Sequence, residues 1–129
     1  SEGEPWTTQN PRISIQPEDW ILDEGQDAWN VMNHNQIKNV LVMGVHLNMC
    51  VLGRPFAIRQ LDALGLRVRL VRDLTDTMYN PEMRPYVSHF KGTEKVIEHV
   101  ERHLCGTVSS SFVSRAGTDQ TAEFRFLDL

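Results

Sequence analysis

Residues 44–55, "GVHLNMCVLGRP", contain two side chains that can act as a base or a nucleophile, His46 and Cys50. An apolar run ends at Gly44, and a helix is predicted to begin near Cys50. A thiol at a helix N-terminus faces free backbone N–H groups and the helix dipole, and both favour the thiolate. The same N–H groups would stabilise an oxyanion formed on an attacked carbonyl. This pattern leaves two interpretations open: a nucleophilic Cys50, or a small cysteine buried in the core.

Other residues of the chain carry similar alternatives. His46 is a candidate base or oxyanion donor, or a packed turn residue. Asp73 and Asp76 flank the end of the next predicted strand at the same sheet edge, where they would bind a ligand, cap a turn or stay solvated. His89 lies in a long loop, where it would reach the site or stay exposed. His99 and His103 have a spacing that suits a metal, but no third ligand is evident, so a solvated helix face is expected and no metal site is predicted.

Three consecutive elements must position this stretch. Asn39–Val45 is apolar on both faces, which is typical of a parallel strand covered on each side. Residues 50–65 are predicted to form one helix, with Gly65 at a helix C-terminus that requires positive φ. Residues 66–73, "LRVRLVRD", form the next predicted strand. Strand, helix and strand together predict one βαβ unit, in which the two strands are parallel neighbours or near neighbours.

The flanking segments are less regular. Residues 12–15, "RISI", predict a short strand, and residues 27–35 a helix. A further helix over residues 94–104 would be capped by Thr93 and would bury a stripe of apolar residues. The tail ends in a possible strand, "EFRF", at residues 123–126.

The whole chain fits one domain of 129 residues, with an irregular arm at residues 1–11 and a variable tail at residues 108–129. The formal net charge is −4 and basic residues do not cluster, which argues against nucleic acid or an anionic membrane as the partner. No apolar run is long enough to span a bilayer, and a cytoplasmic protein is expected. The two cysteines, Cys50 and Cys105, have no CxxC spacing, so neither zinc nor a disulfide is expected.

The string "NVLVMGVHLNMCVLGRPFAIRQLDALGLRVRLVRD" resembles the isochorismatase-like cysteine hydrolase superfamily, and residues 12–107 look like a divergent branch of it. The match is carried by Gly44, Cys50, Val51, Gly65, Val68 and Asp73. The resemblance implies a Rossmann-like three-layer α/β fold, with a parallel sheet and helices on both faces. It also implies that Cys50 attacks a small-molecule amide or a related C–N or C–O bond, without a cofactor.

Further expectations come from the same resemblance. A cis peptide bond is expected at Val45–His46, where it would aim backbone N–H groups, with that of Met49, into an oxyanion hole. A homo-oligomer is expected, because family members commonly oligomerise and a sheet without its N-terminal neighbour would expose apolar residues of Asn39–Val45.

Two departures from the family pattern put activity in question. The family's catalytic aspartate comes from an N-terminal segment that this chain does not contain, and its lysine should lie near "RISIQPED", which offers only Gln16, Glu18 and Asp19. The chain is therefore expected to be either a fragment of a longer hydrolase or a silent family member that binds a small molecule or a protein partner. Slow or absent hydrolysis of simple amides is predicted.

Overall fold

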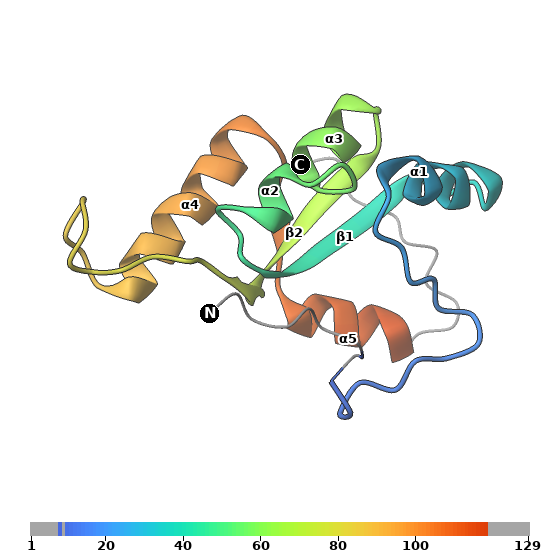
Figure 1. Ribbon diagram of the computed structural model, residues 1–129, viewed down its shortest axis with the longest axis horizontal. Helices are drawn as coiled ribbons and strands as arrows, with labels where there is room; N and C mark the ends of the chain where they lie inside the picture. The colour runs from blue at the N-terminus through green and yellow to red at the C-terminus, as the bar shows by residue number, and fades with distance from the viewer. Residues whose placement is uncertain (1–7, 9, 119–129) are drawn as a thin grey trace.

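The computed structural model describes residue 8 and residues 10–118. It has an α/β fold with a three-stranded, all-parallel sheet in the order β1-β2-β3. Figure 1 shows β1 and β2 side by side. The strands are β1 (Asn39–Val45), β2 (Arg67–Asp76) and β3 (Thr107–Val108). The predicted α/β class is confirmed, and so is the parallel pairing of Asn39–Val45 with the strand that follows it.

β2 is longer than predicted and ends at Asp76 rather than at residue 73. Its register with β1 shifts once: Val42 pairs with Leu70, whereas Val45 pairs with Asp76. The residues of β2 beyond the predicted end therefore continue the parallel pairing up to Val45, the last residue of β1. This brings Asp76 to the sheet edge from which the turn with Cys50 departs.

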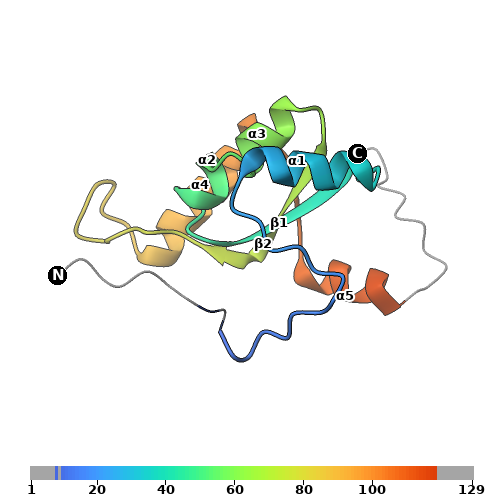
Figure 2. The ribbon, with the colours of Figure 1, turned by 45° about the vertical axis from the view of Figure 1, so that its right-hand side comes forward.

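The helices are α1 (Gly25–His34), α2 (Cys50–Gly53), α3 (Ile58–Ala63), α4 (His89–His103) and α5 (Ser110–Thr118). The helix predicted over residues 27–35 is confirmed as α1, with ends shifted by one or two residues. Figures 1 and 2 place α2, α3 and α4 on one side of the strands and α5 on the other.

The main core lies between the sheet and α2, α3 and α4. Its most buried members come from β2, from the turn after β1, from those helices and from the connection that follows α4: Leu47, Val51, Leu52, Ile58, Leu61, Val68, Leu70, Ile97, Val100 and Cys105. The apolar stripe predicted on α4 is thus confirmed, because Ile97 and Val100 are buried while Val96 and Leu104 pack against the same cluster. Side-chain burial of this kind is the main force that fixes the helices on the sheet.

The single helix predicted over residues 50–65 is wrong. The chain leaves the helical conformation at Arg54, whose ψ is 157°. A residue before proline is pushed out of the helical region, and Pro55 follows Arg54. A second short helix, α3, then begins after Ala57 and is followed by Gly65 at φ 79°, which confirms the expected left-handed glycine.

Thr93 does not cap α4, because the helix begins one turn earlier at His89. The N-cap is Ser88, whose side chain accepts a hydrogen bond from the Lys91 N–H at 3.3 Å. Thr93 is instead buried inside the first turns of the helix, and its hydroxyl donates to Asp76.

The two faces of β1 are not both covered, contrary to the sequence prediction. Among the described residues β1 is an edge strand that pairs with β2 alone, and Met43 and Val45 are 46% and 61% exposed. The buried side chains of the two long strands come from the first half of β2, at Val68, Leu70 and Val71.

Residues 12–15 form no strand. Ile13 closes a turn with Asn10, and Ile13 and Ile15 are exposed. The strand predicted at residues 123–126 lies outside the described residues. Within the part of the chain that the structure describes, no helix is long and apolar enough to cross a membrane.

Candidate functional site

The turn between β1 and α2 is held by hydrogen bonds to the segment that follows β2. The Leu47 N–H donates to the backbone oxygen of Asp76 at 2.7 Å. The Asn48 side chain pairs with the backbone of Met78, donating to its oxygen and accepting from its N–H, both at 3.0 Å. Leu47 is fully buried and anchors the turn in the core. The turn is therefore fixed on one side by packing and on the other by backbone pairing.

Cys50 is the first residue of α2, and its side chain is exposed. The N–H of a first helical residue has no partner inside the helix, so it remains available to a ligand beside the thiol. The position predicted for Cys50, at the start of a helix beyond the carboxyl end of a parallel strand, is confirmed. The interpretation as a buried core cysteine fits Cys105 instead, which is 9% exposed and has a pKa raised by burial.

Cys50 lines a cleft of about 660 Å³. The walls come from the end of β1, from α2 and the Arg54–Ala57 break, and from the residues just before α1: Asp23, Glu24, Val42, Met43, Gly44, Val45, Val51, Arg54, Phe56 and Ala57. The cleft thus combines one thiol, two carboxylates and one guanidinium with an apolar wall. Neither carboxylate takes part in an ion pair within the described residues.

Asp23, Glu24 and Arg54 were missed as site residues by sequence reasoning. Arg54 had a visible signal, because "GRPF" directly follows the helix that Cys50 begins. The sequence signal for Asp23 and Glu24 was weaker, because the two residues stand just before α1 and the predicted helix begins only at residue 27. The segment before α1 brings this pair to the cleft beside the end of β1.

The three residues predicted to form the oxyanion turn separate in the structure. Val45 lines the cleft with Cys50, and the Val45–His46 peptide bond is cis, as the resemblance implied. Met49 is the N-cap of α2, and its N–H already donates to the backbone oxygen of His46 at 3.0 Å. His46 lines a different cavity, of about 610 Å³, together with Tyr79 and His89. It does not line the cleft of Cys50.

The residues expected near the missing lysine, Gln16, Glu18 and Asp19, do not line the cleft. Gln16 and Asp19 form a local turn of their own, in which the Gln16 N–H donates to the Asp19 carboxylate at 2.7 Å. No lysine lines the cleft either. The acid–base candidates that the structure brings to Cys50 are therefore Asp23 and Glu24.

Asp73 has a capping role. Its carboxylate accepts hydrogen bonds from the backbone N–H and the hydroxyl of Ser110, at 2.8 and 2.6 Å, at the start of α5. These bonds hold the pKa of Asp73 below its usual value. Of the alternatives drawn from the sequence, the structure supports the cap.

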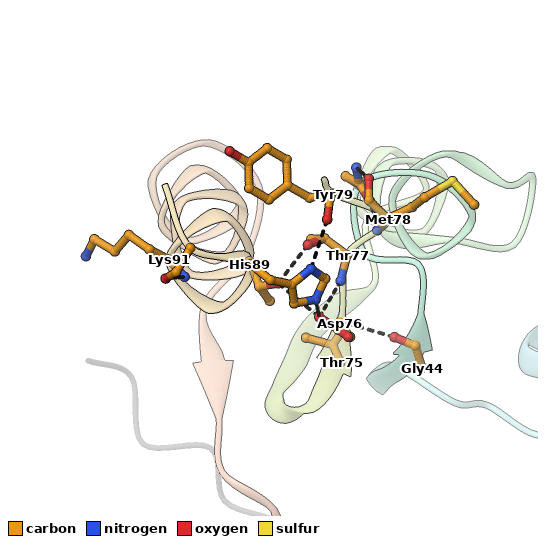
Figure 3. A network of polar contacts seen from close by, with 11 residues as sticks. Gly44, Thr75, Asp76, Thr77, Met78, Tyr79, His89 and Lys91 are labelled. Carbon is orange, nitrogen blue, oxygen red and sulfur yellow. Dashed lines mark hydrogen bonds and ion pairs between the residues drawn. The ribbon is translucent and has the colours of Figure 1, made fainter. Parts of the chain in front are cut away.

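His89 does not lie in the cleft but binds the end of β2. Its Nε2 lies 2.7 Å from the Asp76 carboxylate, and its Nδ1 lies 2.9 Å from the backbone oxygen of Tyr79, as Figure 3 shows. These two partners raise the pKa of His89, the Tyr79 oxygen contributing most. The Thr77 N–H and His89 in turn lower the pKa of Asp76. With both ring nitrogens engaged, His89 has none left for a substrate.

Comparisons with protein-family models, with curated proteins and with solved structures found no match to this chain. Among the described residues, no group of three or more histidine, cysteine, aspartate or glutamate side chains is placed to hold a metal ion.

Proposed function

We propose that this chain is an isochorismatase-like cysteine hydrolase, in which Cys50 attacks a small-molecule amide or a related C–N or C–O bond. One observation carries the proposal: Cys50, whose side chain is exposed, lines a cleft that is also lined by Asp23, Glu24 and Arg54. The motif around Cys50 and the all-parallel sheet support it.

The residues of the cleft can carry both halves of an amide hydrolysis. The Cys50 thiolate attacks the carbonyl carbon, and the oxyanion faces the free N–H at the start of α2. When the C–N bond breaks, the leaving amine takes a proton from Asp23 or Glu24, and a thioester remains on the sulfur. Water then attacks the thioester and gives one proton back to the carboxylate, which releases a carboxylic acid and regenerates the Cys50 thiolate beside the protonated carboxyl group.

The cleft also indicates what kind of substrate fits. Val42, Val45 and Phe56 would pack against an apolar group, and Arg54 would bind a carboxylate or another polar acceptor of the substrate. Met43, which also lines the cleft, is exposed at the β1 edge, and this exposure supports a homo-oligomer in which a second copy lies beside the cleft.

Turnover of small amides by the full chain tests the proposal. Nicotinamide and simple acyl amides serve as probes, and release of the amine is followed with time. We expect slow turnover that Cys50→Ala abolishes and that Cys105→Ala leaves unchanged. Turnover that persists in Cys50→Ala would show that the thiol is not the nucleophile.

A catalytically silent binding protein is the second candidate. It is favoured by one observation, the absence of lysine from the residues that line the cleft. In that case Cys50 would still react with an electrophile, but no amide of the panel would be consumed. A ligand would then bind the cleft with the same affinity in the wild type and in Cys50→Ala.

A further inference from the structure

His89 presents both of its ring nitrogens to oxygen atoms that can only accept hydrogen bonds. Nε2 faces the ionised Asp76 carboxylate and Nδ1 faces the Tyr79 backbone oxygen, at 2.7 and 2.9 Å. A neutral imidazole has only one N–H, so one of these contacts would place two lone pairs against each other. The geometry is satisfied only by the imidazolium, in which both nitrogens donate.

The Asp76 carboxylate is held in place by other donors. Its Oδ1 accepts from the Thr77 N–H at 2.8 Å and from the Thr93 hydroxyl at 3.0 Å. Because the one hydroxyl proton of Thr93 is used here, the 2.7 Å contact between the two threonine hydroxyls must be donated by Thr77. Thr77 and Thr93 are both buried, so this network joins β2 to α4 inside the protein.

The same residues continue to the turn that carries Cys50. The Asp76 backbone accepts from Leu47, and Met78 is paired with Asn48. The ring of His89, on α4, thus contacts Asp76 at the end of β2 and the backbone oxygen of Tyr79. These two partners precede and follow Met78 in the chain (Figure 3).

We propose that doubly protonated His89 is the positioning residue that clamps the segment after β2 and, through it, the turn that leads to Cys50. Loss of one proton removes one of the two bonds and loosens residues 76–79, and with them the hydrogen bonds that Asp76 makes with Leu47 and Met78 makes with Asn48. The clamp is therefore closed at mildly acidic pH and released as the pH rises. It acts on the conformation of the turn, whatever reaction Cys50 takes part in.

The other ionisable groups around His89 do not make the two hydrogen bonds of the clamp in its place. Asp76 is the charged partner on β2. On α4, Lys91 is paired with Glu94 at 2.6 Å. His46, from the turn, lines the same cavity as His89, and Tyr79 meets it through a backbone oxygen. The raised pKa of His89 agrees with the clamp, since both partners favour the charged ring.

Hydrogen exchange of single amides in the full chain tests the clamp. The Leu47 and Met78 amides are compared with Leu70, whose N–H bonds to Gly106 in the sheet. After correction for intrinsic exchange, the protection of Leu47 and Met78 relative to Leu70 should fall about fivefold as the pH rises through the His89 titration, the effect of one net hydrogen bond. His89→Gln should show the lower protection at every pH, and His103→Gln should behave as the wild type.

A second measurement uses the unaltered protein and does not depend on the folding of a variant. Side-chain ¹H–¹⁵N spectra report the charge of each histidine, and His89 should remain an imidazolium to a pH above its ordinary 6.5. A neutral His89 ring below that pH would overturn the proposal. The proposal would also be overturned if the protection of the Leu47 and Met78 amides, relative to Leu70, stayed constant with pH. It would be overturned too if this protection changed with pH by the same factor in His89→Gln as in the wild type.

Discussion

The Cys50 cleft and the His89 network lie on either side of the same turn, and they use polar groups in opposite ways. In the network, each donor that faces Asp76 has its acceptor, and two of the members are buried. In the cleft, the thiol is exposed, and the two carboxylates are without ion pairs among the described residues. Satisfied groups stabilise a conformation, whereas groups without partners remain able to bind or react. The His89 network thus stabilises the turn, and the Cys50 cleft is the candidate site of binding or reaction.

The largest effect is expected from the carboxylates of the cleft. Asp23→Asn combined with Glu24→Gln removes both acid–base groups, and turnover should fall by about 10²–10⁴-fold. Alkylation of Cys50 should remain, because the turn does not depend on these side chains. The matched control is Glu18→Gln with Asp19→Asn, which removes the same charges outside the cleft. If turnover fell equally in the two double variants, Asp23 and Glu24 would not be the acid–base groups of the reaction.

A substitution on the network side should act on stability. Gly92 lies against Tyr79, and an added Cβ would overlap the tyrosine ring. Gly92→Ala should lower the free energy of unfolding by about 1–3 kcal/mol, the usual range for overpacking. Urea denaturation followed by circular dichroism measures this. Gly53→Ala is the control, because its Cβ would meet no atom within 4 Å. An unchanged midpoint in Gly92→Ala would show that Tyr79 does not need this close approach.

The smallest expected effect is a change of stability with pH. The pKa of His89 is raised, so its contribution is fully present below 6.5 and is lost as the pH rises through the folded-state value. The pKa of Asp76 is lowered, so its contribution is present above 3.8 and is lost as the pH falls through the folded-state value. The wild type should therefore have its highest Tm between these limits.

Thermal melts of wild type and His89→Gln across this range check the sign of the effect. The difference between the two proteins should shrink on the alkaline side, where the wild-type ring is neutral as well. A difference that grows with rising pH would contradict the assignment of the charged ring.

The sequence predicts secondary structure best where one short-range pattern of residues determines it. Asn39–Val45 is an apolar run between the polar residues Lys38 and His46, and its predicted ends are the observed ones. The break at Arg54 was missed because a continuous apolar pattern was given more weight than Pro55. The start of α4 was missed because Thr93 also suits a helix N-cap, and the choice of Ser88 depends on burial of Thr93 against Asp76.

The site was predicted only in part. Cys50 follows from its place after a strand, which is a local property. Asp23 and Glu24 depend on how a segment without regular structure passes the sheet, and no periodicity records that path. His89 was expected as a loop residue, because the register shift that brings Asp76 to it arises only when β1 and β2 pair.

Acylation of Cys50 by an activated ester tests the central claim most directly. The folded chain is mixed with p-nitrophenyl acetate at neutral pH, and the acetyl adduct is located by intact mass and peptide mapping. The buried Cys105 serves as the internal reference. A nucleophile prepared by the turn should give one adduct, at Cys50, formed faster in the folded protein than in the same protein unfolded in urea. Acylation of Cys50 that is no faster than in the unfolded chain would contradict the assignment of this cleft as a cysteine hydrolase site.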